Sequence, residues 1–170
     1  QKEPTNLNNP NRNIVAFGDS LTNGNGVERS LAYPAVLENI IGRKVINLGI
    51  SGDTSAQGLA RINQIDEYYP YMVLIELGAN DALRGMSLER ARDNVSQIVD
   101  YVNSKGAIAV VIDTGGVLQM NRYSKLLSKL AQEKNALFVP AIMDGIYNDR
   151  TLKSDNLHPN EKGYELIAKK

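Results

Sequence analysis

Five short apolar runs alternate along the chain with longer stretches in which apolar residues recur every three or four positions. The runs cover residues Ile14–Phe17, Lys44–Leu48, Tyr71–Leu77, Ala107–Ile112 and Leu137–Val139. Continuous apolar runs rich in β-branched residues are typical of strands that are buried on both faces. The pattern therefore predicts five interior strands.

The stretches between the runs have the periodicity of amphipathic helices. They cover residues Leu31–Ile41, Gln57–Tyr68, Leu88–Val102, Arg122–Lys134 and Glu161–Lys169. Alternation of strands and helices predicts an α/β fold in which a parallel sheet carries helices on both faces. Ligands of such folds bind at the carboxyl ends of the strands, so the residues that follow each strand are the candidates for function.

Length and charge limit the classes of protein that fit. The 170 residues suit one domain; we expect it to span residues 14–170, preceded by a flexible, Asn-rich lead-in at residues 1–13. The 19 Lys and Arg residues balance the 19 Asp and Glu residues, so no net charge attracts nucleic acid or an anionic membrane. No apolar stretch reaches the roughly 18 residues that a membrane helix needs. Because the chain starts at Gln1 and not at Met, we expect export to the periplasm. As a separate expectation, the protein is a monomer.

The inventory of reactive side chains is short. The chain has no Cys and a single His, His158. Disulfides, thiol nucleophiles, Cys-ligated zinc and sites built from several His residues are therefore excluded. Any chemistry that needs an imidazole must use His158.

Polar groups that suit acyl transfer follow four of the predicted strands. Ser20 follows the first strand on a sharp turn, and Gly49 ends the second. Asn80 follows the third strand, and Asp155 precedes His158 by three residues beyond the fifth. Each feature alone also fits an ordinary turn or helix cap. Their joint placement at one sheet edge favours a nucleophile, oxyanion donors and a base held by a carboxylate.

The same segments resemble a known family. Four segments resemble, in order, the four blocks of the SGNH/GDSL hydrolases: Phe17–Thr22, the residues around Gly49, Gly78–Asp81 and Asp155–Pro159. The resemblance is strongest to the bacterial branch of multifunctional acyl-CoA thioesterases, lysophospholipases and arylesterases, and it covers nearly the whole chain. It implies a three-layer α/β/α, flavodoxin-like five-stranded parallel sheet. It also implies an enzyme that hydrolyses small acyl esters or thioesters, with no cofactor and no metal.

The resemblance also implies a role for each site residue. Ser20 would be the nucleophile, and His158 would be the general base and then the acid. Asp155 would orient His158. The backbone N–H groups of Ser20 and Gly49, with the side chain of Asn80, would form the oxyanion hole.

The acyl pocket is predicted from the loops that follow the third and fourth strands. Both loops overhang the same sheet edge and offer apolar side chains for a shallow groove that takes short to medium acyl chains. The candidates are Leu83, Met86, Val117, Leu118 and Met120. The alternative is that some of them pack between loop and helix.

Other interpretations stay open. A catalytically inactive lipid- or carbohydrate-binding relative would share the fold, and a flavodoxin-like sheet can also bind phosphate or a flavin. Glu76, which interrupts the third apolar run, is either a second acid or a structural carboxylate paired with an Arg or with backbone donors.

Overall fold

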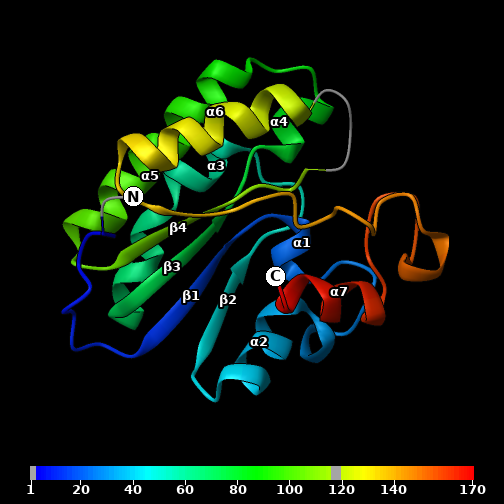
Figure 1. Ribbon diagram of the computed structural model, residues 1–170, viewed down its shortest axis with the longest axis horizontal. Helices are drawn as coiled ribbons and strands as arrows, with labels where there is room; N and C mark the ends of the chain where they lie inside the picture. Colours follow the sequence, from blue (N-terminus) through cyan, green and yellow to red (C-terminus); the bar gives the residue numbers. More distant parts are fainter. Residues whose placement is uncertain (1–2, 116–119) are drawn as a thin grey trace.

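Five parallel strands form one sheet in the order β2-β1-β3-β4-β5 (Figure 1). The structure, a computed structural model, describes residues 3–115 and 120–170. The strands are β1 (Asn13–Gly18), β2 (Val45–Gly49), β3 (Pro70–Glu76), β4 (Ile108–Ile112) and β5 (Leu137–Val139). This strand order is that of flavodoxin-like folds, in which the direction of winding reverses between β1 and β3.

Helices cover both faces of the sheet, so the predicted three-layer α/β/α fold is confirmed. In Figure 1 the helices α3, α4, α5 and α6 lie on one side of the strands, and α2 and α7 lie on the other. The α-helices are α1 (Ser20–Asn23), α2 (Tyr33–Ile41), α3 (Ser55–Ala60), α4 (Ala79–Leu83), α5 (Leu88–Ser104), α6 (Met120–Glu133) and α7 (Glu161–Ala168). Three 3₁₀ segments cover Arg29–Leu31, Ile62–Tyr68 and Arg150–Leu152.

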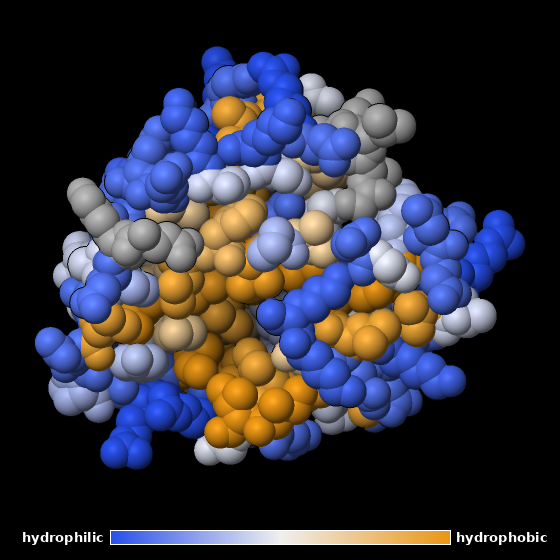
Figure 2. Space-filling view, in the orientation of Figure 1, coloured by the Kyte–Doolittle hydropathy of each residue, from blue (hydrophilic) through white to orange (hydrophobic). Residues whose placement is uncertain are grey.

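Side chains of the strands alternate between two apolar clusters, one on each face of the sheet. On β1, Val15 and Phe17 pack with residues of α5 and α6, whereas Ile14 and Ala16 pack with residues of α2 and α7. Figure 2 shows hydrophobic residues gathered over the strands and at α2, and mainly hydrophilic residues over the helices at the top of the view. Each fully buried large apolar side chain contributes about 1.5–3 kcal/mol to folding, so the sheet is a rigid base for its carboxyl edge.

The structure differs from the predicted helices in two places. The stretch Gln57–Tyr68 is not one helix: α3 ends at Ala60, and a 3₁₀ segment follows. At the junction the guanidinium of Arg61 donates hydrogen bonds to the backbone oxygens of Leu48 and Gly18, which ties this point to the strand ends. The second difference is the short helices α1 and α4, whose four and five residues are too few to show a period in the sequence.

The amino-terminal residues lie along the molecule. The side-chain amide of Asn6 donates to the backbone oxygens of Asn103 and Ala107, and that of Asn9 donates to the oxygen of Pro70. The flexibility of residues 1–13 stays a prediction. Within residues 3–115 and 120–170, no helix combines the length and the apolar character needed to cross a membrane; export and a monomeric state stay predictions.

Candidate active site

The carboxyl edge of the sheet brings Ser20 and His158 together from 138 positions apart in the chain. The distance from Ser20 Oγ to His158 Nε2 is 3.0 Å, and the distance from His158 Nδ1 to Asp155 Oδ2 is 2.8 Å. Both are hydrogen-bond distances. Ser20, His158 and Asp155 therefore form one chain of hydrogen bonds, the relay, which runs from the hydroxyl through the imidazole to the carboxylate.

The histidine is held by a tight local turn. Oδ1 of Asp155 accepts hydrogen bonds from the backbone N–H groups of Leu157 and His158, each at 2.7 Å. Partial burial pushes the pKa of Asp155 upward, but these backbone donors and the imidazole outweigh it and lower the pKa to about 2. Asp155 is thus a carboxylate at neutral pH, which favours the tautomer with the proton on Nδ1 and leaves Nε2 facing Ser20.

The serine is held by the first turn of α1. Ser20 is the first residue of α1, and the carboxylate of Asp19 caps the helix by accepting from the N–H of Leu21 at 3.1 Å. At Gly18 a side chain would collide with the hydroxyl of Thr22 and the backbone oxygen of Glu76. Only glycine lets β1 run this close to its neighbours, and the tight turn exposes the Ser20 hydroxyl.

The predicted oxyanion donors are not all brought together. Ser20 and Asn80 both line the cavity beside His158. Gly49 does not line it, and its N–H donates to Oδ1 of Asn47 at 2.9 Å. Gly52, three residues further on, lines the cavity with φ at 83°. Sequence reasoning missed Gly52, although a second glycine two residues before Thr54, the N-cap of α3, was a visible signal of an exposed backbone turn.

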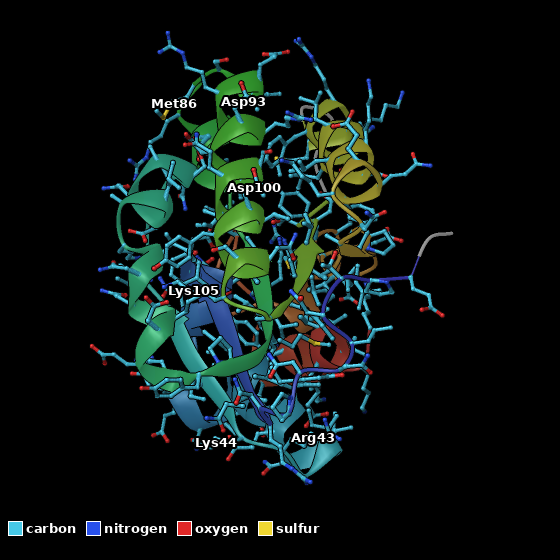
Figure 3. All side chains as sticks on the ribbon, turned by 90° about the vertical axis from the view of Figure 1, so that its left-hand side faces the viewer. Arg43, Lys44, Met86, Asp93, Asp100 and Lys105 are labelled. Carbon is cyan, nitrogen blue, oxygen red and sulfur yellow. The ribbon has the colours of Figure 1, made fainter. Side chains whose placement is uncertain are left out.

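A cavity of about 210 Å³ opens beside the Ser20 hydroxyl. Leu83 and Met120 line it, as predicted, whereas Met86 does not. Met86 lines a separate depression beside Leu88, and in Figure 3 its side chain points outward at the end of the molecule opposite Lys44. Val117 and Leu118 lie outside the described residues. Lining residues that sequence reasoning missed include Leu21, Thr114, Met143, Tyr147 and Leu157.

Comparisons with known proteins identify the family of the chain. The profile of the GDSL-like lipase/acylhydrolase family matches residues 16–166. The chain belongs to this family. It is 33% identical over 164 residues to thioesterase 1/protease 1/lysophospholipase L1 of Escherichia coli strain K12, covering 91% of this chain and 79% of that protein. It is 31% identical to an arylesterase of Vibrio mimicus, covering 91% and 84%.

Solved structures show the same relation. The psychrotrophic esterase EstA from Pseudoalteromonas sp., solved with monoethylphosphonate as inhibitor, superposes with a TM-score of 0.84 at 27% identity and covers 94% of this chain and 93% of that one. Membership of the GDSL-like lipase/acylhydrolase family confirms the predicted class of enzyme, a GDSL-type esterase or thioesterase.

Two buried carboxyl groups lie beneath the site of this GDSL-family enzyme. Burial raises the pKa of Asp19 to about 6, against the opposing effect of the hydrogen bond from Leu21. Burial, and then the negative charge of Asp19, raise the pKa of Glu76 well above its usual value. Glu76 accepts from the N–H of Asp19 and from the hydroxyls of Thr22 and Thr114. The predicted backbone donor is present, and no Arg pairs with Glu76 within residues 3–115 and 120–170.

The described residues hold no group of three His, Asp or Glu side chains arranged to bind a metal ion.

Proposed function

We propose that the protein hydrolyses carboxylic esters or thioesters through an acyl-enzyme on Ser20. The observation that carries this proposal is the relay of Ser20, His158 and Asp155, with joining distances of 3.0 and 2.8 Å, beside an apolar cavity. A serine hydroxyl that is hydrogen-bonded to an unprotonated imidazole nitrogen can lose its proton to that nitrogen, and this arrangement activates serine as a nucleophile.

The reaction has two halves. In the first, Ser20 Oγ attacks the carbonyl carbon while His158 Nε2 takes the hydroxyl proton, and His158 then gives that proton to the departing alcohol or thiol. In the second, water loses a proton to His158 and attacks the acyl-enzyme; His158 then returns that proton to Ser20 Oγ as the acid departs. The carboxylate of Asp155 stabilises the imidazolium that forms in both halves.

We infer that three N–H donors stabilise the oxyanion. We assign them to the backbone of Ser20, the backbone of Gly52 in place of Gly49, and the side-chain amide of Asn80. The Asn80 amide donates at 3.0 Å both to Oδ2 of Asp19 and to the backbone oxygen of Asp53. An oxyanion would therefore share one of these hydrogens as a further acceptor.

The size and the apolar lining of the cavity suit an ester with a short to medium acyl chain. Its volume is about 210 Å³. Apolar side chains of Leu83, Met120 and Met143 line it, so an acyl chain can replace water there. The relatives named as thioesterase, lysophospholipase and arylesterase support the same substrate class.

A fluorophosphonate probe tests the proposal. The expected result is one adduct on the peptide that contains Ser20, none on Ser20→Ala, and a loss of kcat of at least about 10³-fold in that variant. Folded wild-type protein that takes no adduct and hydrolyses no ester would support a non-catalytic lipid- or carbohydrate-binding relative. A panel of p-nitrophenyl esters, acyl-CoAs and lysophospholipids then separates ester from thioester preference.

A further inference from the structure

Glu76 is a buried carboxyl group that the proposed reaction does not use. It is the last residue of β3, its exposed fraction is 0%, and it pairs in register with Gly18 at the end of β1. None of the ion pairs within residues 3–115 and 120–170 includes it. Burying such a group costs free energy, so its contacts show what offsets that cost.

Those contacts join two walls of the active site. Oε2 of Glu76 accepts from the hydroxyl of Thr22 at 3.0 Å and from the backbone N–H of Asp19 at 3.4 Å. Asp19 and Thr22 flank Ser20 on the turn into α1. Oε1 of Glu76 accepts from the hydroxyl of Thr114 at 3.2 Å, and Thr114 follows β4 and lines the cavity. One carboxyl group thus bridges the nucleophile turn and the cavity wall.

The bridge reaches a third element through Asp19. The carboxylate of Asp19 receives the Asn80 amide on Oδ2 and the N–H of Leu21 on Oδ1. A shift of the Asp19 backbone therefore moves both the Ser20 turn and the acceptor that orients Asn80. The ends of β1, β3 and β4 meet at Glu76.

We propose that Glu76 is a positioning residue that holds the Ser20 turn, and through Asp19 the Asn80 amide, at a fixed separation from the Thr114 wall of the cavity. This inference rests on the proposed function. A misplacement of about 1 Å at a reacting group can cost about 10²-fold in rate, so a few hydrogen bonds at this point have a large effect on catalysis.

The test compares Glu76→Leu with Glu76→Gln. Leu cannot accept hydrogen bonds, and we expect it to lower kcat for a short-chain p-nitrophenyl ester about 10- to 100-fold with KM changed less than about threefold. The rate of fluorophosphonate labelling at Ser20 should fall in parallel. Gln should recover kcat to within about threefold of wild type, because its amide oxygen accepts from Thr22 and its N–H₂ can donate to the Thr114 hydroxyl.

Val99→Ala is the control for a general loss of stability. Val99 of α5 is buried in the apolar cluster on the face of the sheet that α5 and α6 cover. Its variant should keep wild-type kcat at 25 °C. If a folded Glu76→Leu protein kept wild-type kcat, or if Glu76→Gln lost as much kcat as Glu76→Leu, the inference would be overturned.

Single-hydroxyl variants keep the test decisive if Glu76→Leu does not fold. Thr22→Val should lower kcat for every ester, whereas Thr114→Val should raise KM for esters with longer acyl chains, since Thr114 borders the cavity. Unchanged kinetics in both variants would refute the positioning role. A wild-type protein that neither labels nor hydrolyses would instead refute the proposed function, so the two failures are distinguishable.

Discussion

Two halves of the active site hold an aspartate next to a reacting residue, and they do so by opposite means. The nucleophile half comprises Asp19–Asn23 with Glu76 and Asn80, and Asp19 is 1% exposed. The histidine half comprises residues 154–160, and the side chain of Asp155 is 54% exposed. Burial raises the pKa of Asp19 to about 6, whereas local backbone donors lower that of Asp155 to about 2.

The contrast teaches where each half obtains its order. The Ser20 turn is ordered by tertiary contacts with β3 and β4, so its geometry depends on the whole sheet. The His158 turn is ordered by hydrogen bonds within a few residues, including the N–H of Ser154 donating to the oxygen of His158 at 3.0 Å. We therefore expect changes in the nucleophile half to have larger effects than changes in the histidine half outside the imidazole.

Asn80→Ala should have the largest effect of the comparison. It removes a proposed oxyanion donor and also leaves Oδ2 of buried Asp19 without its partner. We expect kcat to fall about 10²–10³-fold for every ester, with little change in KM. The matched control is Asn94→Ala, which removes an amide that donates to Ser55 outside the cavity. A loss in Asn94→Ala as large as that in Asn80→Ala would contradict the assignment of Asn80.

Asp155→Asn should have a smaller effect, because water reaches this carboxylate and can stabilise the imidazolium in its place. We expect kcat to fall about 10- to 100-fold, less than the ~10⁴-fold loss typical of a buried triad aspartate. Asp149→Asn is the control, since Asp149 also accepts from a local N–H, that of Thr151, on an exposed turn. A loss of about 10⁴-fold in Asp155→Asn would show that the two halves do not differ in this way.

The two halves also differ in how many of their site residues could be predicted from the sequence. The relay of Ser20 with Asp155 and His158 was predictable because strand ends of a parallel sheet share one edge, and because an Asp three residues before a His can fold back on it. The choice between Gly49 and Gly52 as the proposed oxyanion donor was harder to make. Gly49 ends β2 and Gly52 lies three residues beyond it. The apolar pattern gives no sign that the side chain of Asn47 accepts a hydrogen bond from the Gly49 N–H.

The pH dependence of stability sharpens the comparison further. Asp19 has a raised pKa in the folded protein, so it holds a proton there that the unfolded chain has already lost at about pH 5–6. Its contribution to stability is complete below about pH 4 and is lost as the pH rises through about 6. The lowered pKa of Asp155 acts in the opposite direction, and only below about pH 4.

Urea unfolding of wild type and Glu76→Gln from about pH 4.5 to about pH 7.5 measures this effect. The amide of the variant cannot ionise, so the variant lacks the contribution that the raised pKa of Glu76 makes to the stability of wild type, which is lost as the pH rises above the pKa of Glu76 in the unfolded chain. We expect wild type to lose on the order of 1–3 kcal/mol relative to the variant as the pH rises across this range. A difference between the two proteins that stays constant over the range would mean that the pair titrates alike when folded and unfolded.

The apolar wall was only partly predictable, and for a steric reason. Leu83 and Met86 both follow β3 and both are large and apolar, so the sequence favours neither. Gly85, with φ at 66°, turns the chain after α4, and Met86 then lies in the depression beside Leu88. Met143 and Tyr147 reach the cavity from irregular chain after β5, where no periodicity indicates them.

The pair Leu83 and Met86 gives the smallest and most selective effect. Both side chains are exposed, at 60% and 45%, so either can be shortened with little loss of stability. Leu83→Ala removes apolar contact from the cavity, and we expect KM for hexanoyl to octanoyl esters to rise about three- to tenfold while KM for acetyl esters stays the same. Met86→Ala should leave both within about twofold of wild type. Because the two residues lie only three positions apart, equal effects of the two substitutions would mean that the acyl chain does not follow the cavity beside Ser20.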